Sequence, residues 1–434
     1  MSSARRPVAL LKARLIDPAS GRDEAGGLLA LDGRIVDLGP GVDGQGLPEG
    51  AEVIDCHGQC LAPGLIDMRV QLREPGEEHM ETIASGAEAA AAGGVTSMVC
   101  LPNTDPIIDV AAALEFVARR ARETRRAKVY CYGAVTKGLL GKDLVEMGLL
   151  AESGALAFTD GLKAVADARV MRRALSYAKA FGRRIIQHPE EPRLAEGGLM
   201  NAGELATRLG LSGIAPAAEV MMIERDLHLV AMTGAAYHVA HVSTAAAVEA
   251  IRGAKARGLP VTCDTAPPYF ALNEIAVGDY RTFAKLSPPL RGEADRQAIA
   301  AAVADGTIDC VASDHAPHDQ ESKRVPFAHA AAGVLGLETL LPLTLELYHK
   351  GEAKLIDLLR RMTVAPADLL DLPQGRLAKG APADLLLFDP DRPGRIEVDR
   401  FRSKSKNSPF DGRPVQGRVL LSLVDGRTVF SAEG

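Results

Sequence analysis

Two histidines and one aspartate could carry chemistry in this sequence. His188, His241 and Asp314 stand at the ends of three short apolar runs, 184–188, 236–241 and 308–314. Imidazole and carboxylate groups at such positions can hold a divalent metal or accept and return a proton. Taken singly, each has a plainer interpretation, because strand ends often carry satisfied polar residues and Asp314 could cap a helix.

Arg73 follows the apolar run 65–72, and an arginine can place two parallel hydrogen bonds on a carboxylate. The competing interpretation of Arg73 is an ordinary ion pair with Glu74 or Glu77.

Eight candidate strands position these residues. They alternate with amphipathic stretches such as 167–182, where apolar residues recur at helical spacing. The runs are 65–72, 95–101, 129–134, 155–159, 184–188, 236–241, 259–264 and 308–314. This alternation predicts an α/β fold, a (β/α)8 TIM barrel with its polar residues at the carboxyl ends of the strands. A doubly wound open sheet is the alternative, but no glycine-rich phosphate loop follows the first strand.

Both ends of the chain differ from the middle. Residues 1–60 and 367–434 contain short β-like runs separated by Gly, Asp and Pro. We expect them to form one small β-sandwich, with the barrel over residues 61–366.

Composition excludes several classes of protein. The net charge of -6 and the hydrophobic content of 47% suit a folded protein but provide no basic stripe for nucleic acid or an anionic membrane. No apolar run has the length of a membrane span, and the N-terminus lacks the apolar core of a signal peptide. The six cysteines lie in apolar stretches, which predicts buried thiols and a cytoplasmic location.

Several sequence blocks identify a family. Residues 63–76 read PGLIDMRVQLREPG, and further blocks are AAAAGGVTSMVCLPNT at 89–104, AFTD at 157–160, HVAHVST at 238–244, SPPLR at 287–291 and ASDHAPH at 312–318. KGAPADLLLFDP and SKSKNSPFDG lie near the C-terminus. In these blocks, over nearly its whole length, the chain resembles the type I dihydroorotases of the amidohydrolase superfamily. The resemblance implies pyrimidine biosynthesis and a zinc-dependent cyclic amidohydrolase that interconverts carbamoyl aspartate and dihydroorotate.

The resemblance also implies roles for single residues. His188 and His241 fall on the metal-binding histidines of strands five and six, and Asp314 falls on the metal ligand that shuttles the proton. Arg73, Asn103 and His318 fall on the positions that bind the substrate.

Four family positions are substituted. The His-x-His pair of the first strand falls on Arg69 and Gln71, the bridging carboxylate falls on Gly161, and a substrate-binding asparagine falls on Ser287. An arginine stays protonated, has no lone pair to donate and repels a cation, and a glutamine amide oxygen is a weak zinc ligand. A further change places Pro267-Pro268-Tyr269 where the family has Pro-His-His.

Two functional hypotheses follow from the resemblance. The first is a non-catalytic homologue, a pseudoenzyme that serves as a scaffold for aspartate carbamoyltransferase and forms a homo-oligomer. In this hypothesis Arg69 pairs with Asp314 and its charge fills the vacant metal position. The second is an active cyclic amidohydrolase with a single zinc ion on His188, His241 and Asp314, with Asp160 as the nearest additional ligand.

Overall fold

Two parallel sheets form the centre of the molecule. The computed structural model describes residues 6–432. One sheet contains β6 (Leu65–Val70), β7 (Val95–Cys100) and β8 (Lys128–Cys131), and the other contains β9 (Ile185–Gln187), β12 (Tyr237–Val239), β13 (Val261–Thr265) and β14 (Cys310–Val311). These strands lie at seven of the eight predicted runs.

The eighth predicted run, 155–159, forms no strand. Instead, Phe158 makes isolated parallel bridges to Gly133 and Ile185, which lie next to β8 and at the start of β9. On the opposite side, Val70 at the end of β6 bridges His315, just after β14. Parallel bridges therefore connect the two sheets on both sides.

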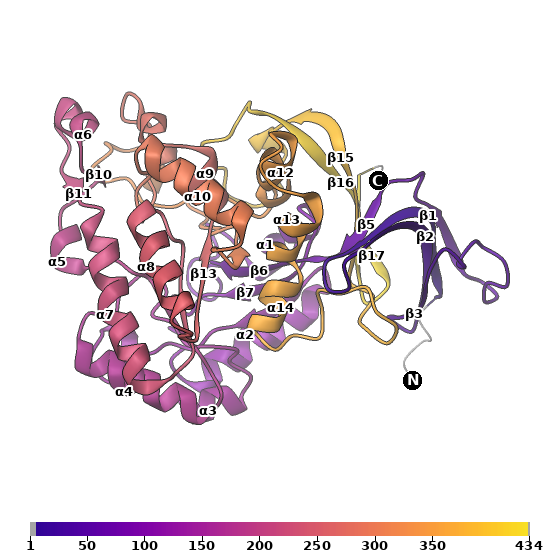
Figure 1. The fold of residues 1–434 in the computed structure, drawn as a ribbon, viewed down its shortest axis with the longest axis horizontal. Helices are drawn as coiled ribbons and strands as arrows, with labels where there is room; N and C mark the ends of the chain where they lie inside the picture. Colours follow the sequence, from indigo (N-terminus) through magenta and orange to yellow (C-terminus); the bar gives the residue numbers. More distant parts are fainter. Residues whose placement is uncertain (1–5, 433–434) are drawn as a thin grey trace.

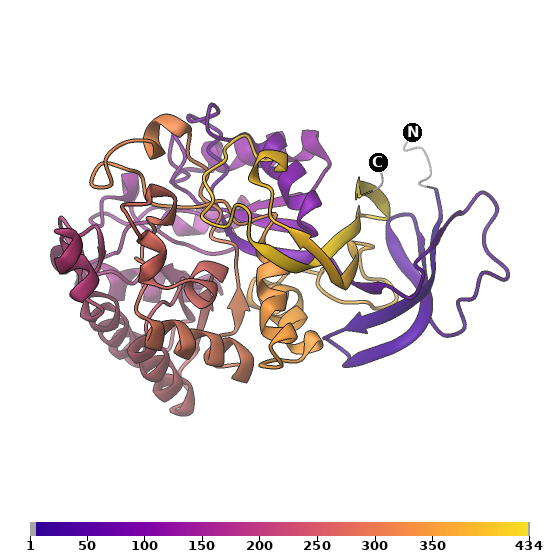
Figure 2. The same cartoon turned by 90° about the horizontal axis from the view of Figure 1, so that it is seen from above.

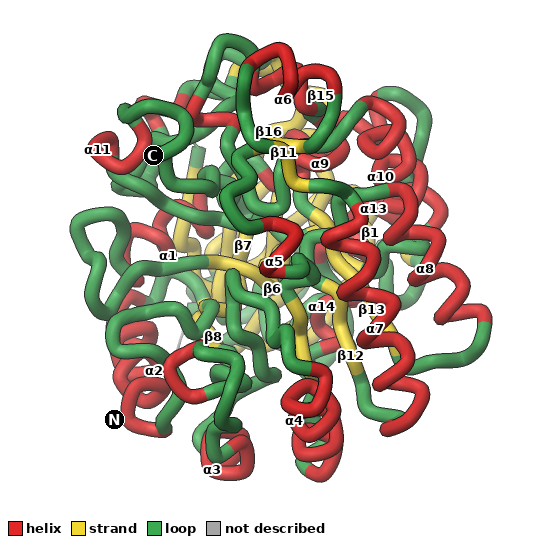
Figure 3. The backbone as a smooth tube through the Cα atoms, turned by 90° about the vertical axis from the view of Figure 1, so that its left-hand side faces the viewer, coloured by secondary structure: helices red, strands yellow, loops and turns green. Residues whose placement is uncertain are grey.

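Helices surround these strands (Figure 3). The longer ones are α1 (Ile83–Ala92), α2 (Ala111–Thr124), α4 (Ala168–Ala180), α7 (Ala217–Thr233), α8 (Ala245–Ala256), α10 (Glu293–Asp305), α12 (Leu340–His349) and α13 (Leu355–Met362). The shorter ones are α3 (Met147–Glu152), α5 (Pro192–Ala195), α6 (Glu204–Leu209), α9 (Pro267–Ala271), α11 (Gln320–Lys323) and α14 (Val364–Leu369). Strands covered on the outside by helices are apolar on both faces, which explains their nearly continuous hydrophobic runs.

The helix predicted at 167–182 is α4, which begins and ends slightly inside those limits. Asp167 caps its first turn by accepting hydrogen bonds from the backbone N–H groups of Arg169 and Val170. The helix buries Met171 and Ala174 among its apolar residues, but Phe181, which was expected on that face, lies past its end and is exposed.

The two ends of the chain meet in one sheet (Figures 1 and 2). Its order is β17-β16-β15-β5-β1-β2-β3, and β4 pairs with β1. The members are β1 (Val8–Asp17), β2 (Arg22–Leu31), β3 (Arg34–Gly39), β4 (Glu52–Asp55), β5 (Cys60–Pro63), β15 (Leu385–Arg395), β16 (Pro414–Val424) and β17 (Arg427–Ser431). The sheet is continuous between the two ends of the chain, because β5 pairs with both β1 and β15.

The interior positions the site. A buried apolar cluster that includes Ile66, Met68, Val99 and Ala312 lies among the central strands and packs against Leu370 after α14. Polar side chains follow these strands at their carboxyl ends.

All six cysteines are buried and unpaired, as expected. Among residues 6–432, no helix combines the length and apolar character needed to cross a membrane.

Candidate functional site

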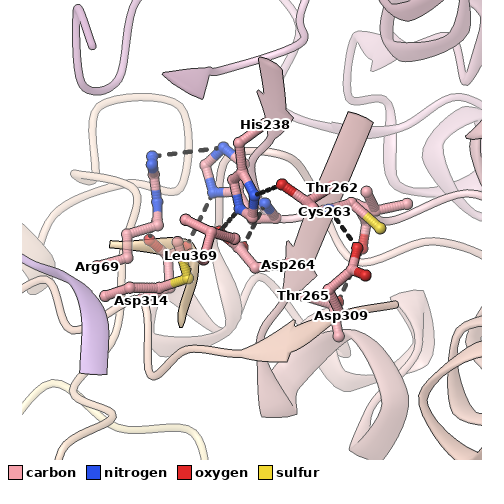
Figure 4. Close-up of polar contacts among 12 residues, drawn as sticks. Arg69, His238, Thr262, Cys263, Asp264, Thr265, Asp309, Asp314 and Leu369 are labelled. Carbon is pink, nitrogen blue, oxygen red and sulfur yellow. Dashed lines mark hydrogen bonds and ion pairs between the residues drawn. The ribbon is translucent and has the colours of Figure 1, made fainter. Parts of the chain in front are cut away.

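Arg69, near the end of β6, lies in the predicted metal position. Its side chain is 2% exposed, and its Nε donates to Oδ1 of Asp314 over 2.8 Å. A terminal guanidinium nitrogen donates to the carbonyl oxygen of Gly161 over 3.2 Å. The Arg69–Asp314 contact predicted from the sequence is confirmed, and a buried cation stands beside this carboxylate (Figure 4).

The two site histidines are hydrogen-bonded to each other. Nδ1 of His188 lies 2.6 Å from Nε2 of His241, and Nδ1 of His241 lies 3.2 Å from Oδ2 of Asp314. A carboxylate only accepts hydrogen bonds, so Nδ1 of His241 carries the proton. Nε2 of His241 then accepts from His188, with a guanidinium nitrogen of Arg69 at 3.5 Å. His241 therefore keeps no lone pair for another ligand.

The charges of this network agree with its hydrogen bonds. Burial and the nearby Arg69 lower the pKa of His241 to about 4, so its ring is neutral near pH 7. Burial alone would raise the pKa of Asp314, but His241 and Arg69 outweigh that effect and hold the pKa well below its ordinary value. One cation and one anion therefore face each other inside the protein.

Gln71 and Asp160 point their side chains to other partners. The Gln71 amide oxygen accepts from Nδ2 of Asn103 over 3.0 Å. Asp160 accepts from the backbone N–H groups of Val135 and Thr136, both at 2.9 Å, and from the hydroxyl of Thr136. The carboxylate of Asp160 thus holds the loop after β8 and takes no part in the Arg69 network.

The residues present do not fit a zinc ion. Two imidazole ligands of tetrahedral zinc stand roughly 3.3 Å apart when each Zn–N bond is about 2.0 Å long. The facing nitrogens of His188 and His241 are closer, at 2.6 Å, and share a proton. Within residues 6–432, no three His, Cys, Asp or Glu side chains gather in an arrangement that could hold a metal. Binding of zinc would require Arg69 to leave and the histidines to separate.

Of the residues predicted to bind substrate, Arg73 and His318 lie next to each other. The guanidinium of Arg73 donates to Glu77 over 2.7 Å and to the Pro317 carbonyl over 3.1 Å, and lies 3.4 Å from Nε2 of His318. The alternative ion pair with Glu77 is therefore present. Asn103 is committed to Gln71, and Ser287 is half-buried next to Pro288.

Sequence reasoning missed several positioning residues. Asp264 accepts from the backbone N–H of His241 over 2.7 Å and lies 2.9 Å from Nε2 of His238 (Figure 4). His241 and Asp314 both have positive φ, 36° and 52°, a conformation that needs such support. The HVAH spacing placed His238 and His241 near one strand end, but no pattern identified Asp264 as their common partner.

We expect His318 to make stability fall as the pH is lowered. Burial and the neighbouring Arg73 lower its pKa to about 3, whereas the unfolded chain takes up this proton near pH 6.5. Between these values the unfolded state binds more protons, so the free energy of unfolding decreases, by at most about 5 kcal/mol from this group. Urea unfolding of wild type and His318→Asn at several pH values measures this contribution. The difference between their free energies of unfolding should become smaller as the pH is lowered.

The matched control for that experiment is His57→Asn. The His57 side chain is 80% exposed, so its replacement should leave the pH dependence unchanged. Parallel curves for wild type and His318→Asn would contradict the expectation.

Comparisons with known proteins identify the family of this chain. A family model described as dihydro-orotase-like matches residues 58–247. The chain is 47% identical over 429 residues to a protein named dihydroorotase from Anaplasma phagocytophilum (strain HZ), covering 98% of this chain and 96% of that protein. A protein of the same name from Syntrophobacter fumaroxidans is 47% identical over 424 residues, covering 97% and 96%. Among solved structures, the L-hydantoinase (dihydropyrimidinase) from Arthrobacter aurescens superimposes with a TM-score of 0.87 at 26% identity, covering 98% of this chain and 96% of that one.

Proposed function

Because this chain belongs to the dihydroorotase family, we propose that it is a dihydroorotase-like protein of pyrimidine biosynthesis whose zinc-dependent reaction has been lost. It acts in the cytoplasm as a scaffold for aspartate carbamoyltransferase and forms a homo-oligomer. Its parallel strands form a closed (β/α)8 barrel, and that barrel is kept for its shape. The single observation that carries the proposal is the buried Arg69 guanidinium bonded to Asp314.

The chemistry of Arg69 supports this proposal. A guanidinium remains charged at any pH a protein tolerates and has no lone pair for a metal. In its observed position the guanidinium repels a divalent cation. It also forms an ion pair with Asp314, the carboxylate that would otherwise return a proton. Its positive charge also prevents Asp314 from being a buried, unpaired anion, so the substitution removes a catalytic site without leaving an uncompensated charge.

The alternative function is a cyclic amidohydrolase with one zinc ion. His188, His241 and Asp314 lie together and favour this alternative. Asp160, the nearest further carboxylate, is committed to Val135 and Thr136, which counts against it. The alternative therefore requires the Arg69–Asp314 pair to open when zinc binds.

One experiment separates the two functions. The full-length protein is purified with and without added zinc, its metal content is measured, and both carbamoyl aspartate and dihydroorotate are supplied as substrates. We expect substoichiometric zinc and no turnover in either direction, because the donor set does not fit the metal. Co-expression with aspartate carbamoyltransferase should give a complex that stays together during gel filtration.

Two results would each count against one part of the proposal. Turnover that appears on zinc loading and disappears in His241→Ala would overturn the loss of catalysis. Separate elution of the two proteins at micromolar concentration would overturn the scaffold role while leaving the loss of catalysis intact.

A further inference from the structure

An arginine-rich groove lies away from the candidate site, beside the β15–β16 hairpin and α12. Its cavity has a volume of about 440 Å³. Among residues 6–432, five arginines line it, at positions 392, 395, 400, 402 and 418, together with two carboxylates, Glu338 and Glu397. The chain as a whole has a net charge of -6, so this local excess of positive charge is opposite to that of the molecule.

Most of these guanidinium groups have no partner within the described residues. Arg400 pairs with Glu397 over 2.5 Å. The side chains of Arg392, Arg395, Arg402 and Arg418 make no hydrogen bond or ion pair with any residue between 6 and 432. Their donors point to solvent or to a ligand. Like charges gathered in one groove repel one another, and a bound anion relieves that repulsion.

Arg413, just before β16, shows how a nearby arginine is satisfied within the fold. Its Nε and one terminal nitrogen donate to the two oxygens of Glu346, each over 2.8 Å. The groove arginines lack such a fork-to-carboxylate pair. Their donors are therefore available for an anion of similar geometry, such as a phosphate group.

The remaining carboxylate in the groove contributes little negative charge. One oxygen of Glu338 accepts from the backbone N–H groups of Arg402 over 2.7 Å and Ser403 over 3.4 Å. Burial raises the pKa of this carboxyl to about 7, so it is partly protonated near neutral pH. It holds the groove wall in place and does not neutralise the arginines.

A second cavity is also rich in basic residues, and two of them are paired within the fold. It has a volume of about 1060 Å³ and includes Lys128 and Arg427. Lys128 pairs with Asp384 and Asp425, both at 2.7 Å, and Arg427 donates to the carbonyl of Arg125. The donors of these two residues are already used within the fold.

We propose that the groove beside β15 and β16 binds a polyphosphate chain. Forked arginines match phosphate oxygens, and the cavity volume lies within the range of about 300–1,000 Å³ that small-molecule sites occupy. Phe401 and Phe430 among the lining residues provide apolar surface on which a nucleobase could stack. The phosphate chain is the recognised chemistry, whether a nucleotide or an inorganic polyphosphate carries it.

Ligand binding should also restrain the adjacent segment that runs to the candidate site. Asn407 accepts from the backbone N–H of His318 over 3.0 Å and donates to the Ala316 carbonyl over 2.9 Å. Backbone exchange of residues 402–407 is therefore a second readout. It reports occupancy of the groove without relying on any enzymatic activity.

The test uses calorimetric titration of the full chain with inorganic triphosphate, ATP and UTP at moderate salt. Saturable binding with one site per chain is expected. The variant Arg392→Gln/Arg395→Gln/Arg418→Gln should bind roughly 1,000-fold more weakly, because each of the three lost charge-assisted contacts costs about tenfold. These side chains support no other part of the fold, so the variant should unfold like the wild type.

The control variant removes the same charge from exposed positions of α4: Arg169→Gln/Arg172→Gln/Arg173→Gln. It should bind within about twofold of wild type, since distant surface charges are screened by salt. Tighter binding of ATP or UTP than of triphosphate identifies a nucleotide as the source, and equal binding identifies the bare phosphate chain. Absence of saturable binding, or an equal loss in both variants, would overturn the proposal.

Discussion

Replacing Arg69 with methionine is expected to lower the free energy of unfolding by about 3–5 kcal/mol. The change leaves Asp314 without its 2.8 Å guanidinium partner in a site where the arginine is 2% exposed. It also removes the donor to the Gly161 carbonyl. Urea unfolding followed by far-ultraviolet circular dichroism measures the loss.

A double-mutant cycle isolates the pair. Asp314→Asn alone leaves Arg69 charged and unpaired, whereas Arg69→Met/Asp314→Asn removes both charges. The double variant should lose less stability than the sum of the single variants, by about 2–3 kcal/mol. Arg14→Met is the control, because Arg14 forms a similar pair with Asp23 at 43% side-chain exposure, and its loss should cost about 1 kcal/mol or less. Equal effects of Arg69→Met and Arg14→Met would refute the argument.

Restoring the three substituted ligand positions should restore zinc binding. In the variant Arg69→His/Gln71→His/Gly161→Asp, we expect zinc content to rise from substoichiometric to at least one ion per chain. The site then has a carboxylate and additional imidazoles in place of a fixed cation. Elemental analysis after dialysis measures the change, and excess zinc at about 1,000 times its Kd should stabilise the variant by about 4 kcal/mol.

Residue 161 has space for this change, although its positive φ strains the backbone with any side chain. Gly161 has φ of 69°, a conformation that aspartate adopts more readily than most residues. A Cβ atom added there meets Cβ of Asn103 at 3.6 Å, which is ordinary van der Waals contact.

The matched control carries asparagine at residues 69, 71 and 161. It removes the guanidinium and keeps similar side-chain sizes but adds no imidazole or carboxylate. Zinc binding by both variants would mean that Arg69 alone excludes the metal. If neither variant binds zinc, then residues around the site, and not only positions 69, 71 and 161, prevent metal binding.

Under the proposal that a metal site was lost, the Arg69 network accounts for the retained fold. Two metal-binding histidines and an aspartate, left without a cation, would be a buried cluster with unsatisfied polar atoms. Arg69 supplies one positive charge to Asp314, and His188 and His241 satisfy each other. The substitutions therefore form one compatible set.

The sequence by itself determined the family and all seven central strands, although the eighth predicted strand does not form, and it identified the residues that differ from the resembled family. These features depend on local patterns: apolar runs define strands, and PGLID and LREPG flank Arg69 and Gln71 at fixed spacing. The sequence also motivated the Arg69–Asp314 pair, because a buried aspartate next to a substituted metal position needs a cation.

Only the tertiary structure decided how the polar groups are shared. Gln71 is bonded to Asn103, Asp160 supports the loop after β8, and Asp264 positions His241. These contacts depend on the directions of side chains on strands that are far apart in sequence. The single continuous terminal sheet likewise depends on β5 pairing at both edges. Local patterns carry no information about such pairings. Each pairing depends on which strands are neighbours in the folded chain and on which hydrogen-bond donors remain unpaired at that place.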